Sequence, residues 1–202
     1  LLEAASKSDR SFAILLVNLD RFKDINDSLG HGAGDDLLKQ AAQRLRQVLR
    51  DYDTIARLGA AMARAVHSLH QQNVCHLDLK PGNVLFSSDD HAILLDFGLS
   101  CHSHYPDLLA EEMRKAVGSP VWISPEQVVG VRGDPRSDIF AIGVMLYQLC
   151  TGELPFGEPQ TAAGLRQRLW MDPKPPRALR PDLPDWLDVV LQKALHPDPA
   201  KR

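Results

Sequence analysis

The pattern of hydrophobic and polar positions divides the chain into stretches of different period. A short apolar run over residues 12–17 is typical of a strand buried on both faces. Apolar positions at helical spacing predict amphipathic helices at residues 35–50, 60–72, 161–170 and 185–195. Residues 54–58 fit either a further short strand or the start of the next helix.

Residues 137–150 are apolar around the whole circumference of a helix. Their large apolar side chains are Ile139, Phe140, Ile142, Val144, Leu146, Tyr147 and Leu149. We therefore predict a helix that is buried on all sides.

Short strand-like pieces and one long irregular stretch complete the pattern. Residues 84–86 and 92–95 are separated by a polar stretch, which predicts a hairpin. Residues 99–126 show no sustained period and are interpreted as a long ordered loop, a kind of segment that often carries function. Together the elements predict the α+β fold class.

Composition narrows the function classes. A hydrophobic fraction of 44% with 24% charged residues fits a folded protein of one domain or two small ones. A net charge of −3 offers no basic surface, so no nucleic-acid partner is expected. No apolar run approaches the roughly 20 residues of a membrane span, so no membrane segment is expected. The three cysteines form no C-x-x-C pair and predict neither a zinc site nor a disulfide framework, which favours a cytoplasmic location.

Chemistry-bearing residues gather in the run His76-Leu77-Asp78-Leu79-Lys80-Pro81-Gly82-Asn83, followed by Asp96-Phe97-Gly98. Further along come Gly118-Ser119-Pro120, Ser124-Pro125-Glu126, Asp138 and Arg202. A lone Asp-Phe-Gly is usually only a turn, and each motif by itself would be weak evidence. In this order and spacing, over residues 60–202, the set resembles the C-terminal lobe of serine/threonine protein kinases.

This resemblance implies transfer of a phosphoryl group from ATP to a Ser or Thr hydroxyl of a protein substrate. Such transfer depends on positioning and charge neutralisation more than on covalent chemistry. Asp78 would orient the hydroxyl and accept its proton, and Lys80 would place a positive charge against the phosphate. Asn83 and Asp96 would hold Mg²⁺, which prefers hard oxygen ligands. Ser119 would tie the substrate-binding loop to Asp78 and Lys80.

The resemblance also implies structural roles. Glu126 and Arg202 would form a buried ion pair that holds the lobe together, and Asp138 would anchor the backbone of the catalytic loop. Leu77 stands where the family usually has an Arg that pairs with a phosphorylated activation loop. The usual pairing with a phosphorylated activation loop therefore lacks its Arg here, and the sequence leaves regulation open.

The N-terminal lobe of a kinase has no match in the sequence. The run Gly30–Asp35 has Asp where the glycine-rich phosphate loop needs its last Gly, and no strand directly precedes it. The strand predicted at residues 12–17 contains no lysine. We therefore expect a lobe that lacks both its N-terminal partner and its final helix, and that is inactive as an isolated chain.

The first 59 residues resemble a different family. The run Asn18–Asp27 with Gly30-His31 and Gly34-Asp35 resembles the GGDEF family of diguanylate cyclases. The expected organisation is a truncated βαα GGDEF-like fragment at residues 1–59 and a kinase C-terminal lobe at residues 60–202.

The GGDEF resemblance assigns vestigial nucleotide-binding roles. Phe22 and Lys23 would approach phosphates, and Asn26 and Asp35 would contact guanine. Asn18 stands where the family has its first metal-binding carboxylate, and the signature hairpin is absent. Cyclase activity is therefore not expected.

Three interpretations remain open. The chain is a phosphotransferase that acts on a protein substrate, a non-catalytic interaction module that binds a docking partner, or a non-functional chimera of two truncated domains. Stabilisation by Mg²⁺ and ATP would favour the first, and cooperative folding without a nucleotide effect would favour the second.

Overall fold

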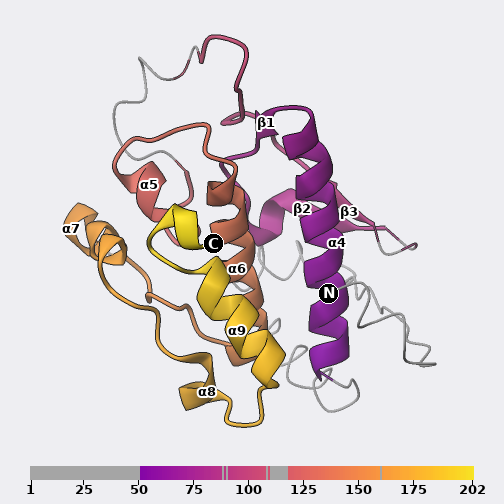
Figure 1. Ribbon diagram of the computed structural model, residues 1–202, viewed down its shortest axis with the longest axis vertical. Coiled ribbons are helices and arrows are strands. Elements are labelled where there is room, and N and C mark those ends of the chain that lie inside the picture. The colour runs from indigo at the N-terminus through magenta and orange to yellow at the C-terminus, as the bar shows by residue number, and fades with distance from the viewer. Residues whose placement is uncertain (1–50, 88, 90, 108, 110–117, 160) are drawn as a thin grey trace, which may run out of the picture. The chain divides into compact units, whose positions relative to one another are not determined.

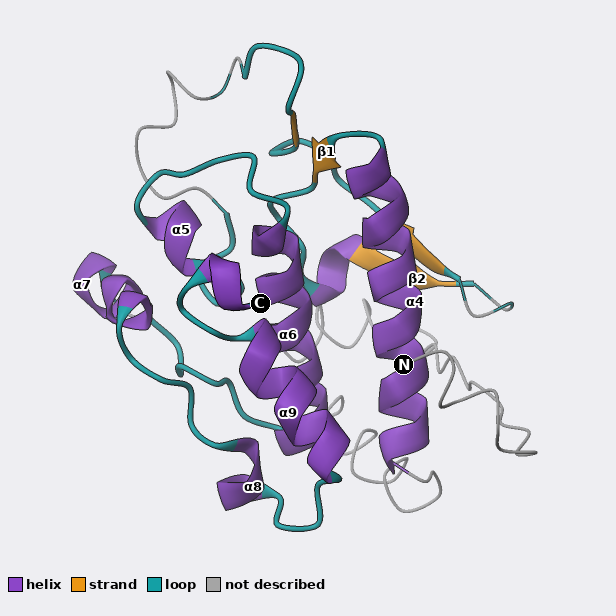
Figure 2. Ribbon diagram, viewed as in Figure 1, coloured by secondary structure: helices purple, strands orange, loops and turns teal. Residues whose placement is uncertain are grey.

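Helices dominate the part of the chain that the structure describes (Figures 1 and 2). This computed structural model describes residues 51–202, apart from residues 88, 90, 108, 110–117 and 160. Residues Ile55–Arg202 form one compact unit. The strand predicted at residues 12–17, the helix predicted at 35–50, and Phe22, Lys23, Asn26 and Asp35 lie outside the described residues.

The described elements alternate between long helices, short helical turns and very short strands. In chain order they are α4 (Asp51–Gln71), β1 (Val74–Cys75), the 3₁₀ helix η1 (Pro81–Asn83), β2 (Val84–Phe86), β3 (Ala92–Leu94), β4 (Cys101–His102), α5 (Pro125–Val128), α6 (Arg136–Thr151), α7 (Ala162–Arg166), η2 (Gln167–Leu169), α8 (Pro176–Leu179), α9 (Asp185–Ala194) and η3 (Pro199–Lys201). Mixed helix and sheet agrees with the predicted α+β class.

Helix α4 begins earlier than the sequence pattern placed it. The helix predicted from residue 60 starts at Asp51, so residues 54–58 belong to its first turns and not to a strand. Ile55, Met62 and Val66 are all less than 9% exposed and recur at helical spacing, which explains why one face of the helix continues through this stretch. The helix crosses the predicted boundary between residues 59 and 60 without a break.

Helix α6 forms the centre of the core, as its apolar circumference predicted. Phe140, Val144 and Tyr147 are fully buried. Leu149 departs from the prediction and is 45% exposed, close to the end of the helix. The helix ends at Gly152, whose φ of 75° is the left-handed conformation that glycine adopts without strain.

Helix α9 packs against α6, and the two lie side by side in Figure 1. Leu187 and Leu191 of α9 are at most 2% exposed, and Leu183 and Leu195, just outside its two ends, continue the four-residue spacing and are fully buried. Gly143 of α6 allows the close approach, because a Cβ at this position would lie 2.9 Å from the Cβ of Ala194.

Two small antiparallel sheets position the loops. Strands β2 and β3 form the predicted hairpin, with Val84 opposite Leu94. Strands β1 and β4 also pair, with Cys75 opposite Cys101. Strands β1 and β4 are too short to show an alternating pattern, so the sequence did not predict this second sheet.

Short helices account for the other differences from the sequence prediction. The helix predicted at residues 161–170 is α7 followed by η2. Helix α5 begins at the end of the predicted loop 99–126 and has a capping box, in which Ser124 and Gln127 bond reciprocally. The short helix α8 was also not predicted.

Candidate active site

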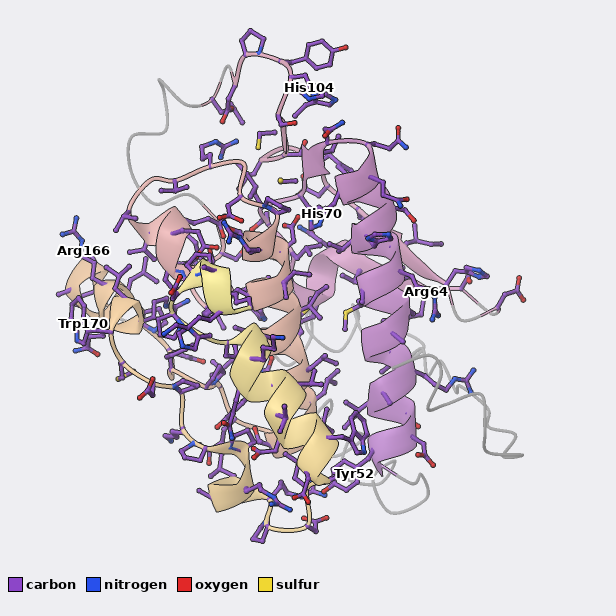
Figure 3. The ribbon with its side chains drawn as sticks, viewed as in Figure 1. Tyr52, Arg64, His70, His104, Arg166 and Trp170 are labelled. Carbon is purple, nitrogen blue, oxygen red and sulfur yellow. The ribbon has the colours of Figure 1, made fainter. Side chains whose placement is uncertain are left out.

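The catalytic loop predicted at residues 76–83 is held by a carboxylate from the first turn of α6. Asp138 is fully buried, and its oxygens accept hydrogen bonds from the backbone N–H of His76 at 2.9 Å and of Leu77 at 2.8 Å. His70, near the C-terminal end of α4 (Figure 3), places its Nε2 2.8 Å from the same carboxylate. The anchoring contact expected of Asp138 is thus present.

Leu77 gives this loop its bend. Its φ of 65° lies in the left-handed region, which costs a non-glycine residue about 1–2 kcal/mol. The two bonds to Asp138 hold one side of the peptide chain, and Gln127 Nε2 donates to the Leu77 carbonyl at 2.8 Å. The Leu77 side chain is 3% exposed and lines a small hollow with Trp122 and Ile123. The residue in place of the usual Arg is therefore a core residue here.

The carboxylate of Asp78 accepts hydrogen bonds from other residues of the predicted catalytic site. Oδ2 accepts from Lys80 Nζ at 2.8 Å and from Asn83 Nδ2 at 3.3 Å. Oδ1 accepts from both the backbone N–H and the hydroxyl of Ser119 at 3.0 Å. Ser119 therefore joins residues 118–120 to Asp78, as expected, while Lys80 uses the other oxygen. Asp78 is 9% exposed, so the cluster sits at the edge of the buried region.

The β2–β3 hairpin brings the two predicted metal ligands to neighbouring positions. The Leu95 N–H donates to the Asn83 carbonyl at 2.9 Å, which extends the ladder and places Asp96 next to this pair. Asn83 donates through Nδ2 to the Asp78 carbonyl at 2.8 Å, and its Oδ1 is the amide atom suited to a metal. The Asp96 side chain is exposed, and its Oδ1 accepts from the Gly98 N–H at 3.2 Å. An amide oxygen and a carboxylate are the hard oxygen ligands that Mg²⁺ prefers.

Glu126 and Arg202 form the buried ion pair that the sequence predicted. Their two contacts are parallel, at 2.6 Å and 2.8 Å, and the two side chains are 7% and 0% exposed. Ser137 also donates to Glu126 at 2.7 Å. Arg202 Nε donates to the His196 carbonyl at 2.7 Å, and its guanidinium lies over the Phe140 ring. The pair therefore joins α5, α6 and the C-terminal end of the chain.

Sequence reasoning missed Arg168, which supports the segment just after Ser119. Its side chain is 1% exposed and donates to the carbonyls of Ile123 at 2.6 Å and Val121 at 3.4 Å. Burial lowers its pKa to about 10. Backbone carbonyls carry no sequence signal, so the motif pattern could not indicate this contact.

Arg132 was also missed. It forms an ion pair with Asp107 and donates to the Leu99 carbonyl at 2.9 Å. One guanidinium thus ties the segment that follows Asp96-Phe97-Gly98 to the loop before α6. Arg132 bonds groups 25 and 33 residues away, which no local pattern reveals.

Comparison with known proteins agrees with this geometry. The family model described as "Protein kinase domain" matches residues 30–202. The chain belongs to the protein kinase family. The match begins before residue 60, so it includes part of the segment in which the GGDEF resemblance was found, and that resemblance remains a prediction.

Curated relatives are bacterial serine/threonine kinases. Serine/threonine-protein kinase PknB of Mycolicibacterium smegmatis is 32% identical over 143 residues, which is 71% of this chain and 23% of that protein. Serine/threonine-protein kinase PksC of Streptomyces coelicolor is 30% identical over 174 residues, or 86% of this chain and 30% of that protein. The kinase chain thus spans about a quarter to a third of these relatives, and its ancestry is that of a serine/threonine phosphotransferase.

The sequence predicted no membrane segment, and the helices of this kinase chain can be compared with the length and apolarity that a membrane span needs. Among the residues that the structure describes, no helix is both long and apolar enough to cross a bilayer.

Proposed function

We propose that residues 76–138 carry the phosphoryl-transfer site of a serine/threonine protein kinase. The observation that carries the proposal is the Asp78 carboxylate, which contacts Lys80, Asn83 and Ser119 at once. A carboxylate with this many fixed donors is held in one orientation, as positioning a substrate hydroxyl for in-line attack requires.

Each residue has a role in this proposal. Asp78 orients the protein substrate's Ser or Thr hydroxyl and accepts its proton, while Lys80 carries a positive charge to the transferred phosphoryl group. Asn83 Oδ1 and the Asp96 carboxylate hold Mg²⁺. When bound, Mg²⁺ and ATP supply the phosphoryl group and neutralise its charge. Ser119 keeps the substrate-binding segment in register with Asp78.

Apolar side chains beside the site support nucleotide binding. Leu85 and Ile93 lie opposite one another on the hairpin and are 54% and 47% exposed, and Phe97 is 45% exposed. The exposed Leu85–Ile93 pair lies on the hairpin that leads to Asp96 and offers an apolar surface for a flat base. The sequence shows no glycine-rich loop or strand lysine, so we expect the 202-residue chain alone to bind nucleotide at this surface but to transfer little or no phosphate.

The test is thermal unfolding of the whole chain with Mg²⁺ and ATP, ATP with EDTA, or neither. A ligand that binds only the folded state at ~100 times its dissociation constant adds about 2.7 kcal/mol to the free energy of unfolding. The proposal expects a rise in Tm with Mg²⁺ and ATP that Asp96→Ala abolishes. The control Asp185→Ala removes an equal charge at an 84% exposed site and should keep the rise.

Other outcomes would favour the other two interpretations. Cooperative unfolding with no shift in Tm would indicate a non-catalytic interaction module that binds a docking partner. Unfolding without cooperativity would indicate a chimera without a working fold. Where a shift is present, phosphorylation of a Ser or Thr peptide should be lost in Asp78→Asn.

A further inference from the structure

Two cysteines face each other across the small sheet that flanks the site. Cys75 of β1 and Cys101 of β4 are direct partners in the antiparallel register, so their side chains project from the same face. The Ser103 N–H donates to the Asn73 carbonyl at 2.9 Å, and ladder bonds recur every second residue. The cysteines are thus a hydrogen-bonded pair, whose Cα atoms lie about 5.5 Å apart. This separation is inside the Cα range of about 4.4–6.8 Å for a disulfide. The Cβ atoms of such a pair are about 5.5 Å apart and must approach by about 1 Å, and the resulting strain makes a disulfide here easy to reduce.

The two thiols of this pair differ in acidity. A hydrogen bond between them raises the pKa of Cys75 and lowers the pKa of Cys101. Burial opposes the lowering at Cys101, whereas the nearby Arg132 guanidinium assists it. Cys101 therefore holds the more anionic sulfur, and the thiolate is the form of cysteine that reacts with oxidants.

Exposure gives the same order of reactivity. Cys101 is half-buried, whereas Cys75 is 6% exposed. The third cysteine, Cys150, is fully buried in α6, and burial raises its pKa to about 12. The chain thus contains one opposed pair with an accessible member and one inert cysteine that serves as an internal reference.

Metal binding is the competing chemistry at this place. His70, Cys75 and Asp138 offer ligand atoms that lie within 4.8 Å of one another. Both oxygens of Asp138, however, already bind the catalytic loop backbone, and Oδ2 also contacts His70. A metal would have to displace the bonds that hold the loop, so the geometry favours chemistry between the two thiols.

We propose that Cys75 and Cys101 form a reversible disulfide when the chain meets hydrogen peroxide. The Cys101 thiolate attacks one peroxide oxygen; an S–O bond forms, the O–O bond breaks, and the departing hydroxide takes a proton to become water. The Cys75 thiol then loses its proton and attacks the sulfenic sulfur; the S–S bond forms and the S–O bond breaks, releasing a second water. Two thiols are oxidised by two electrons in total, and the peroxide is reduced. Two equivalents of a small thiol reverse the change.

This disulfide would connect the two parts of the proposed transfer site. Cys75 comes three residues before Asp78, and Cys101 comes five residues after Asp96. The bond would therefore fix covalently the distance between the loop that holds the substrate and the loop that holds the metal. The proposal goes beyond the proposed kinase activity, and its test does not require that activity.

The experiment treats the whole chain with hydrogen peroxide in EDTA, which removes metal chemistry. The expected product is a monomer lighter by two hydrogen atoms, in which peptide mapping joins Cys75 to Cys101 and leaves Cys150 as a thiol. The cross-link should raise Tm by up to about 15 °C, and dithiothreitol should remove both the mass change and the rise. Cys150→Ser should retain the product, whereas Cys75→Ser and Cys101→Ser should lose it.

Several results would overturn the proposal. Oxidation of Cys101 to sulfinic acid without a cross-link, a dimer joined between chains, or a bond to Cys150 would each do so. Mapping is carried out on the natural sequence, so the conclusion does not depend on whether a cysteine variant folds. Unfolding of each variant, monitored by circular dichroism, separates loss of the bond from loss of the fold.

Discussion

Buried charges in this chain are supported by several partners each. Arg202 bonds both oxygens of Glu126 and the carbonyls of His196, Pro197 and Arg136. An ion pair of this kind contributes little when compared with apolar residues of equal volume, but removal of one member leaves a buried charge without a partner. The loss of stability on replacing Arg202 therefore comes mainly from the Glu126 carboxylate that stays buried without its partner.

We predict that Arg202→Ala lowers the free energy of unfolding by about 3–5 kcal/mol, because Glu126 would stay buried and unpaired. Lys201→Ala is the matched control, since Lys201 is the exposed neighbour and should change stability by less than about 0.5 kcal/mol. Urea denaturation measures both values. Equal effects of the two substitutions would show that the ion pair does not hold the lobe together.

Sequence motifs indicated which side chains would meet only where the motif itself fixes the geometry. Asp78 with Ser119, Asp138 with the loop backbone, and Glu126 with Arg202 are brought together as expected, while their chemical roles remain predictions. Gln127 and Arg168 escaped notice because each bonds a backbone carbonyl, and every residue has one. The capping-box spacing from Ser124 to Gln127 was a usable signal for α5.

At the scale of elements, the packing of α6 on α9 depends on one small residue. The absent side chain of Gly143 leaves space for Ala194 and Leu195. Helix propensity alone would favour Ala over Gly by about 1 kcal/mol, so the two effects have opposite sign. A contact of 2.9 Å between carbon atoms is too short to be absorbed without movement of α9.

Gly143→Ala should therefore destabilise the chain by about 1–3 kcal/mol, despite its better helix propensity. Gly164→Ala provides the comparison, since Gly164 lies in α7 and a Cβ there would have no neighbour closer than 3.5 Å. That variant should be neutral or more stable by up to about 1 kcal/mol. Thermal unfolding of both variants measures the two effects. A Gly143→Ala variant more stable than the natural chain would show that α9 can move away from the added methyl group at no cost, and would contradict the prediction.

Element prediction succeeded where a hydrophobic period had room to repeat. Helices α6 and α9 and the β2–β3 hairpin were all predicted from their patterns. The predicted start of α4 was too late, because the kinase resemblance begins at residue 60 while the apolar face of the helix continues on both sides of that position. Strands β1 and β4 and helix α8 are too short to show a repeating pattern and exist through tertiary contacts.

For the molecule as a whole, the buried Tyr147 hydroxyl and Cys150 thiol of α6 make the free energy of unfolding depend on pH. Burial raises the pKa of Tyr147 to about 12 and that of Cys150 to about 12, from ordinary values of 10.0 and 9.0. The unfolded chain loses these protons first, so the folded state binds more protons between about pH 9 and 12. Each group therefore makes stability fall as pH rises through that window.

We predict that Tyr147→Phe makes stability fall less steeply above about pH 10 than in the natural chain. Arg168 makes stability rise with pH over this range, because its folded pKa of about 10 lies below its ordinary 12.5. Both proteins contain Arg168, so its effect cancels in the comparison. Urea midpoints at several alkaline pH values provide the measurement. Tyr105→Phe, at a side chain that is 70% exposed, is the control, and identical slopes for Tyr147→Phe and the natural chain would contradict the prediction.

Asp138 belongs both to the first turn of α6 and, through its hydrogen bonds, to the catalytic loop. Thermodynamic reciprocity follows from this shared side chain. A ligand that stabilises the ordered loop also stabilises the first turn of α6, because the bonds to Asp138 hold both segments. A second ligand that stabilises this turn of α6 would therefore raise the affinity of the loop for its own ligand, and the loop's ligand would raise the affinity for the second by the same factor.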